Sequence, residues 1–253
     1  MTTASDTALA RGSDILVALA LLTRLPGLAN TDRTRGARAA WAYPVAGACV
    51  AAIAWAAGAF ALWMGLAPPF AAGLALLAAV MVTGALHEDG LADVADGFWG
   101  GWDTARRLEI MKDSRIGSYG VIALGLSLIL RWAALTMLLD AGGALWAFVA
   151  AGAASRAGMA SVMGALPHAR EGGLSHATGR PEAGTIWLGV LVAAGIGLVA
   201  VGFGIFAVAL AVAVVCAAAA LVARSKIGGQ TGDVLGAAQQ LAEIAALMVL
   251  ASA

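Results

Sequence analysis

Charged residues are scarce in this chain, and neither sign of charge is in excess. Acidic and basic residues make up 12% of the 253 residues, and fifteen Lys and Arg balance fifteen Asp and Glu. An average soluble domain carries about 25% charged residues, so this is not the composition of an ordinary soluble protein. The lack of a basic surplus also argues against a nucleic-acid-binding protein, which needs a positive surface.

Cysteine is rare as well, because the chain has only Cys49 and Cys216, which lie far apart in apolar stretches. Two isolated cysteines argue against a disulfide framework and give no spacing for a cysteine metal site. We expect both thiols to be buried or to face lipid.

Long apolar runs are what the chain has in abundance, and 61% of its residues are hydrophobic. A helix needs about 20 apolar residues to cross the hydrocarbon core of a bilayer. Seven runs approach or exceed this length: 41–65, 69–86, 119–139, 144–163, 184–201, 204–222 and 234–253. We predict an all-α, polytopic helical membrane protein with about seven transmembrane helices and polar cytoplasmic loops, forming a single integral-membrane domain over residues 1–253.

The residues ahead of these runs predict no removable signal peptide, because they show no convincing small-residue cleavage pattern. The apolar stretch 15–22 belongs to a segment, 15–25, that is short for a span and is followed by Pro26. This length is typical of a partial, re-entrant or interfacial helix.

Basic residues gather in alternate connections between the apolar runs. They lie before the first long run and after the second, fourth and sixth, whereas the other connections hold none. By the positive-inside rule, we expect the N-terminus and three longer polar segments in the cytoplasm, with the C-terminus outside.

The first polar segment opens with an acidic motif, HEDGLADVADGFWGG, at residues 87–101. If the second span continues past His87, the spacing of Asp89, Asp93 and Asp96 places them on one helix face. Three such carboxylates repel one another, and charge near the bilayer is costly. A magnesium ion bound together with substrate phosphates resolves this conflict, and manganese has the same ligand preference. The alternative is a solvated loop whose aspartates cap helices.

Basic residues follow the acids. Lys112 and Arg115 lie in KDSRIGSYG, and cations beside magnesium stabilise the charge on a transferring phosphoryl group. Arg106 and Arg107 are explained equally well as residues that set the topology.

The motif GGQTGD, residues 228–233, lacks the lysine of a nucleotide-binding phosphate loop. It either presents backbone N–H groups to an anion or forms a turn capped by Thr231 or Asp233.

Ionisable residues within the apolar runs support two further hypotheses. Glu243 needs a partner, and Arg131 or Arg156 can supply it in a structural pair; in a transporter the same three residues would form an ion path. A zinc site is a weaker hypothesis, because its three histidines have no helical ligand spacing. Those histidines are His87, His168 and His176.

Five motifs resemble those of the cobalamin synthase family, the adenosylcobinamide-GDP ribazoletransferases. They are LLTRLP, EDGLADVADGFWGG, KDSRIGSYG, GGLSHATGRP and GGQTGDVLGAAQQLAE, in this order from residue 21 to residue 243. The resemblance implies a magnesium-dependent enzyme of the bacterial inner membrane that acts late in vitamin B12 assembly. Its substrates would be adenosylcobinamide-GDP and α-ribazole or its 5′-phosphate, and its products adenosylcobalamin or its 5′-phosphate and GMP. The resemblance leaves open whether the chain forms a homo-oligomer.

The resemblance also implies roles for individual residues. Asp89, Asp93 and Asp96 would hold magnesium on the diphosphate, supported by Glu88 or Asp113. Lys112 and Arg115 would neutralise the diphosphate, and Asp96 or His87 would accept the proton of the attacking hydroxyl. The polar residues expected to shape the guanosine and ribazole pockets are Ser175, His176, Arg180, Thr231 and Asp233.

Two other classes of membrane transferase also use magnesium and a diphosphate. They are the alcohol phosphotransferases of phospholipid synthesis and the prenyltransferases. The phospholipid enzymes carry Ala-Arg after their first Asp-Gly pair and a longer gap before their last aspartates, so their signature is not met here.

Overall fold

The computed structural model describes residues 8–28, 30–142 and 144–253. Residues 1–7, to which the signal-peptide prediction applies, and Gly143, in a predicted connection, lie outside this description. The described residues form helices joined by loops, with one isolated backbone bridge between His168 and Gln230. In chain order the helices are α1 (Ser13–Leu22), the 3-10 helix η1 (Gly36–Ala42), α2 (Tyr43–Trp63), α3 (Pro68–Thr83), α4 (Leu86–Gly100), α5 (Thr104–Ile110), α6 (Ser118–Asp140), α7 (Leu145–Ala165), α8 (Leu174–Thr178), α9 (Ala183–Val201), α10 (Gly204–Ile227) and α11 (Gly232–Ala251).

Six stretches of helix are long and apolar enough to cross a membrane: η1 with α2, then α6, α7, α9, α10 and α11. The bent pair α3 and α4 raises the number to seven if it counts as one span. The polytopic helical architecture predicted from the apolar runs is therefore confirmed. Helix α1, with ten residues, is too short to span and matches the expected partial helix.

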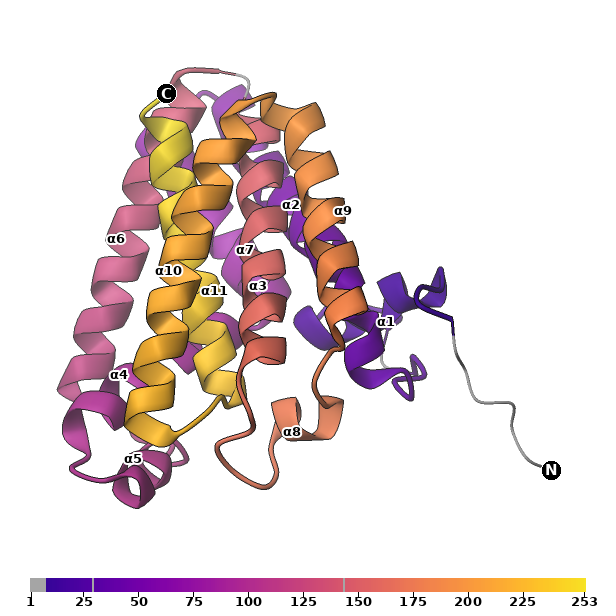
Figure 1. The fold of residues 1–253 in the computed structure, drawn as a ribbon. Helices are drawn as coiled ribbons and strands as arrows, with labels where there is room; N and C mark the ends of the chain where they lie inside the picture. The colour runs from indigo at the N-terminus through magenta and orange to yellow at the C-terminus, as the bar shows by residue number, and fades with distance from the viewer. Residues whose placement is uncertain (1–7, 29, 143) are drawn as a thin grey trace.

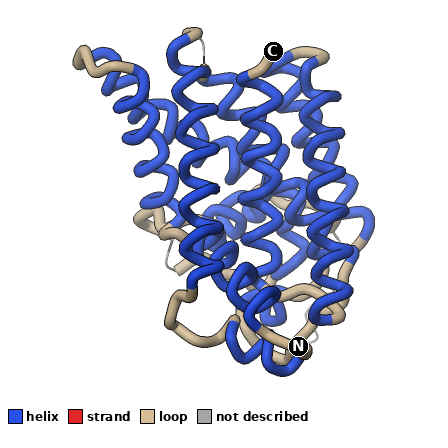
Figure 2. Tube along the Cα trace, turned by 90° about the vertical axis from the view of Figure 1, so that its left-hand side faces the viewer, coloured by secondary structure: helices blue, strands red, loops and turns tan. Residues whose placement is uncertain are grey.

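The long helices run side by side, and the short polar elements gather at one end of the bundle (Figure 1). Helices α5 and α8 and the turn between α10 and α11 lie at this end, which we call the polar end, whereas the C-terminus lies at the other. The view from the side shows the same separation (Figure 2). The three polar segments expected on one side of the membrane thus lie together.

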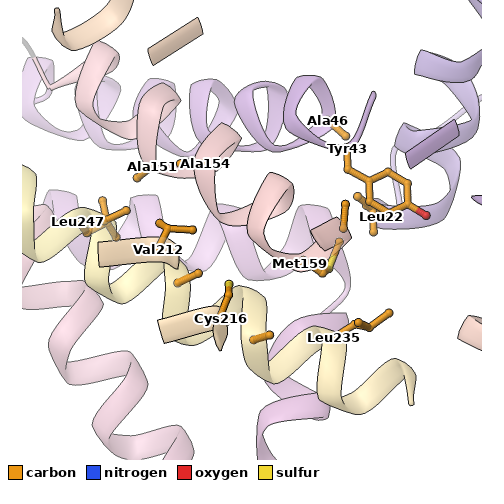
Figure 3. Packing of buried hydrophobic residues seen from close by; sticks show 14 of the residues in the cluster. Leu22, Tyr43, Ala46, Ala151, Ala154, Met159, Val212, Cys216, Leu235 and Leu247 are labelled. Carbon is orange, nitrogen blue, oxygen red and sulfur yellow. The ribbon is translucent and has the colours of Figure 1, made fainter. Parts of the chain in front are cut away.

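Helix α7 is the centre of the bundle, because it packs against α2, α9, α10 and α11. Small residues make this possible: a Cβ on Gly47 of α2 or on Gly152 of α7 would collide with the carbonyl oxygen of the other glycine. Such close backbone approach is how helices associate in membranes, where burial from water gives no driving force. Figure 3 shows alanines packed with larger apolar side chains in this core, among them Met159 and Leu247.

Candidate functional site

A sharp break between α3 and α4 brings the acidic motif to the polar end. Gly84 and Ala85 both have positive φ, 65° and 56°, and the two helix axes differ by 87°. For Ala85 this left-handed conformation costs about 1–2 kcal/mol. The second predicted span therefore does not continue into the aspartates: it ends at Thr83, and the aspartates lie on a separate helix.

Helix α4 nevertheless arranges the aspartates as a stripe, as their spacing predicts. Asp89 is exposed, Asp93 is half-buried and Asp96 is buried, so the stripe runs from solvent into the protein. The inner member has a defined task, because the Asp96 carboxylate accepts N–H bonds from Gly117 (2.7 Å) and Gly120 (2.9 Å). Asp96 thereby satisfies two free donors at the N-terminus of α6.

The outer part of the stripe faces a cavity of about 420 Å³. The cavity brings together six charged residues expected at the site, from α4 and from the loop between α5 and α6: Glu88, Asp89, Asp93, Lys112, Asp113 and Arg115. Its volume lies within the range of about 300–1,000 Å³ that is usual for small-molecule sites.

The basic side of this cavity is exposed. Arg115 forms an ion pair with Asp113 (2.7 Å), and this hydrogen-bonded guanidinium lowers the pKa of the Asp113 carboxyl. The ammonium group of Lys112 has no hydrogen-bond or ion-pair partner in the part of the chain that the structure describes. The Lys112 ammonium and a guanidinium paired with Asp113 therefore line the same cavity as the acids of α4.

A fourth aspartate reaches the stripe from α11. Helices α4 and α11 pack so closely that a Cβ on Gly90 would lie 2.8 Å from the carbonyl oxygen of Asp233. The Asp233 carboxylate interacts electrostatically with that of Asp93 and is paired with Arg170 at 3.1 Å. Sequence reasoning placed Asp233 in a nucleoside pocket and gave Arg170 no role. No local pattern joins residues 63 positions apart.

Two carboxylates of the stripe have no direct partner in the described part of the chain, although the charge of Arg170 acts on that of Asp93. Within the described ranges, Asp89 and Asp93 accept no hydrogen bond and form no ion pair. No group of three or more acidic, histidine or cysteine side chains among the described residues is close enough to hold a metal by itself. Magnesium, however, is usually bound through one or two carboxylates plus substrate phosphates. The arrangement fits an ion that arrives with a diphosphate.

His87 does not belong to the cavity. Its side chain is 2% exposed, lies inside the bundle and is not part of the cavity lining. The other two histidines lie elsewhere: the rings of His168 and His176 are 5.1 Å apart, in the second polar segment. The described residues thus provide no three-histidine zinc site.

The second and third polar segments are fastened to each other. Gln230 accepts a hydrogen bond from Ser175 (2.7 Å) and contacts the Nδ1 atom of His168 (3.0 Å). Burial, with smaller contributions from His176 and Arg180, lowers the pKa of His168, so this ring is neutral at pH 7.

Two other residues expected in substrate pockets are engaged within the protein. Thr231 is the N-cap of α11, as one interpretation of GGQTGD predicts, and accepts the N–H of Val234 (3.3 Å). Arg180 donates to the carbonyl oxygen of Gly164 (2.7 Å) near the end of α7.

Arg107, a base of the first polar segment, has a structural contact. Its guanidinium donates to the carbonyl oxygen of Lys226 (2.9 Å), near the end of α10.

A charged network lies inside the bundle and meets the cavity at Glu88. Arg131 contacts Glu88 (3.0 Å) and Glu243 (3.7 Å), and Arg156 is hydrogen-bonded to the same Glu243. Gln240 also donates to Glu88 (3.2 Å). The structural pairing expected for Glu243 is confirmed, and two acids balance two bases. This balance disfavours the transporter hypothesis, which needs ionisable groups available to a moving ion.

Sequence comparisons agree with the motifs quoted above. A family model described as Cobalamin-5-phosphate synthase matches residues 14–251. The chain is 48% identical to the adenosylcobinamide-GDP ribazoletransferase of Mesorhizobium japonicum, over 93% of this chain and 92% of the relative. The protein of the same name from Azorhizobium caulinodans is 46% identical, over 93% of this chain and 94% of the relative. That of Bradyrhizobium diazoefficiens is 42% identical, over 95% of this chain and 94% of the relative. No solved structure matches. The chain belongs to the cobalamin-5-phosphate synthase family.

Proposed function

We propose that this protein transfers the adenosylcobinamide phosphate group from adenosylcobinamide-GDP to α-ribazole or α-ribazole 5′-phosphate and releases GMP. The name shared by relatives that align over nearly the whole chain supports this reaction. The family match favours it over phospholipid alcohol phosphotransfer and prenyl transfer. The observation that carries the proposal is the cavity at the polar end. Its lining combines Asp89 and Asp93, which have no ion-pair or hydrogen-bond partner among the described residues, with the cations Lys112 and Arg115.

The carboxylates of Asp89 and Asp93 would hold magnesium, with manganese as a substitute. Both residues line the cavity and have no partner among the described residues. Magnesium bound there would neutralise charge on the diphosphate of the substrate. Asp233 and Arg170 stand next to Asp93 and would adjust the local charge.

The chain's own cations would position the diphosphate. Lys112 and Arg115, from the loop between α5 and α6, line the same cavity as Asp89 and Asp93 of α4. Phosphoryl transfer depends mainly on positioning and on charge stabilisation, since the protein takes little part in the covalent chemistry. A diphosphate held between the two walls would present the phosphorus on the cobinamide side to the hydroxyl of the ribazole.

The proton of that hydroxyl must pass to a group that reaches the cavity. Asp89 and Asp93 meet this requirement, whereas Glu88 also lines the cavity but is bound to Arg131 and Gln240. Asp96 and His87, the residues expected for this role, do not line the cavity. Both oxygens of Asp96 are also bound to backbone N–H groups of α6.

We further propose that the polar end faces the cytoplasm of a bacterial cell and that the bundle lies in the inner membrane. The basic residues of the chain concentrate in the segments at this end, and basic loops remain on the cytoplasmic side. The cavity would then open toward the compartment that holds nucleotides.

A reconstituted assay tests the reaction. Detergent-purified protein given adenosylcobinamide-GDP, α-ribazole and magnesium is expected to release GMP together with the joined corrinoid product. Chelation should stop the reaction, and magnesium or manganese should restore it. Asp89→Asn should abolish activity, whereas Asp140→Asn, which changes an exposed aspartate at the opposite end of α6, should not. Failure of folded parent protein to form GMP would contradict the proposal.

A further inference from the structure

An apolar groove lies between α7, α9 and α10, away from the acidic cavity. It has a volume of about 440 Å³, and alanine and glycine supply most of its lining. Figure 1 shows α9 and α10 joined near the end that carries the C-terminus, with α7 between them toward the polar end. All three helices are candidate membrane spans, so the groove lies at the depth of the lipid.

The lining excludes a polar ligand. The hydroxyl of Ser161 donates to the carbonyl oxygen of Ala157 in its own helix (2.9 Å), and the thiol of Cys216 is the other polar group in the lining. A nucleotide or an amide-rich molecule would leave its polar groups unpaired here, at a cost of several kcal/mol for each. A hydrocarbon chain has no such groups.

The length of the groove suits an acyl chain. Its α10 wall runs from Ile205 to Ala220, which corresponds to about 22 Å at 1.5 Å per residue. One leaflet supplies about half of a hydrocarbon core that is about 30 Å thick. The groove is therefore long enough to contact an acyl chain over the whole thickness of the leaflet at the polar end.

A cation lies in line with the groove at the polar end. Ala213, Ala217 and Ala220 line the wall, and Arg224 follows one turn later on the same helix face. The Arg224 side chain is exposed and has no ion-pair or hydrogen-bond partner among residues 8–28, 30–142 and 144–253. The guanidinium of Arg180, near the end of α7, donates to the carbonyl oxygen of Gly164 (2.7 Å), so it is engaged within the protein, whereas that of Arg224 is available to a headgroup.

We propose that this groove is a binding site for an anionic phospholipid, with an acyl chain between α7, α9 and α10 and the phosphate on Arg224. The apolar lining selects the chain, and the aligned guanidinium selects the negative headgroup. Fixed lipid at this position would fill the space between α9 and α10, which small side chains leave open.

Native mass spectrometry of the full-length protein, titrated with phosphatidylglycerol or phosphatidylcholine, tests the proposal. The parent should retain one phosphatidylglycerol. Ala217→Phe fills the groove and should remove this adduct, whereas Ala218→Phe, on the neighbouring exposed residue outside the lining, should keep it. Arg224→Gln should weaken phosphatidylglycerol about fivefold, the change that corresponds to about 1 kcal/mol per basic residue, and leave phosphatidylcholine unchanged.

Three results would overturn the proposal. Equal retention by Ala217→Phe and Ala218→Phe would mean that lipid binds elsewhere. An unchanged phosphatidylglycerol affinity in Arg224→Gln, a surface substitution that should not affect folding, would remove the headgroup contact. A dimer that carries no lipid and is lost in Ala217→Phe would show that a second copy of the chain occupies the groove.

Discussion

The protein holds two groups of opposite charges, one inside the bundle and one at the cavity, and they differ in how the charges are paired. Inside the bundle Glu243 contacts two arginines, and Arg131 also contacts Glu88. At the cavity Asp89 and Asp93 have no partner among the described residues, and the cations facing them are exposed. Buried charge must be neutralised for the protein to be stable, whereas charge left open at a cavity is available to a ligand. Glu88 belongs to both groups, because it lines the cavity and pairs with Arg131. The other residues divide into those that hold the fold and those expected to act on substrate.

Removing one member of the buried network should have the largest effect on stability. Glu243→Leu leaves Arg156 buried without an acid, which costs about 3–5 kcal/mol in comparable pairs. The double variant Arg156→Leu, Glu243→Leu keeps the pair of Arg131 and Glu88 and should recover most of this loss. Thermal denaturation in detergent measures both. A single variant as stable as the parent would mean that the network does not support the fold.

Removing the free cation should affect activity without affecting stability. Lys112→Met takes away an ammonium group that has no partner among the described residues, so unfolding should be unchanged. Loss of one group that stabilises charge in the transition state typically lowers kcat about 100-fold. Initial rates of GMP release measure this. Arg106→Met, at an exposed residue paired with Glu109 outside the cavity lining, is the matched control.

Asp96 tests the difference between the two groups, because it lies on the same helix stripe as Asp89 and Asp93 but binds backbone N–H groups. Asp96→Asn replaces one acceptor oxygen by a donor that faces the N–H of Gly117 or Gly120. Loss of such a cap costs about 1 kcal/mol, and activity should fall less than in a variant that removes a free carboxylate. An activity loss with unchanged stability would move Asp96 into the reaction.

The smallest effect concerns pH and His168, which lies outside both groups. Its pKa in the folded protein is below the ordinary value of about 6.5. The unfolded chain therefore takes up the proton first, so the stabilisation is complete above about pH 6.5 and declines as the pH falls. The melting temperature of the parent should drop more between about pH 7.5 and pH 5.5 than that of His168→Asn. Equal drops would contradict the assigned pKa direction.

Much of the architecture follows from local sequence. Apolar runs of sufficient length predicted the spans, and the spacing of Asp89, Asp93 and Asp96 predicted a helical stripe. The break before α4 was missed, because "VTGALHEDG" contains no proline and Ala85 gives no sign of a left-handed conformation. Close packing of α11 on α4 accompanies the break, with Gly236 beside the backbone of His87. Contacts between distant segments are not visible in one sequence.

The same limit applies to the site. The cations at Lys112 and Arg115 follow the acids closely in the chain, and the structure places them on one cavity as expected. The backbone bridge between His168 and Gln230 joins the loop before α8 to the loop before α11. This bridge brings Arg170 and Asp233 together. The role expected for His87 overlooked its position on the inner face of α4, where it is buried.

We propose that the carboxylates of Asp89 and Asp93, which have no ion-pair or hydrogen-bond partner among the described residues, serve the reaction and not the fold. The most direct test is to measure GMP release and thermal stability on the same preparation of Asp93→Asn. We predict at least about a 100-fold loss of activity. Stability should equal or slightly exceed that of the parent, because burial of this carboxylate and repulsion from Asp233 and Asp89 together outweigh the attraction of Arg170. Retained activity, or a loss of stability like that of Glu243→Leu, would contradict the account.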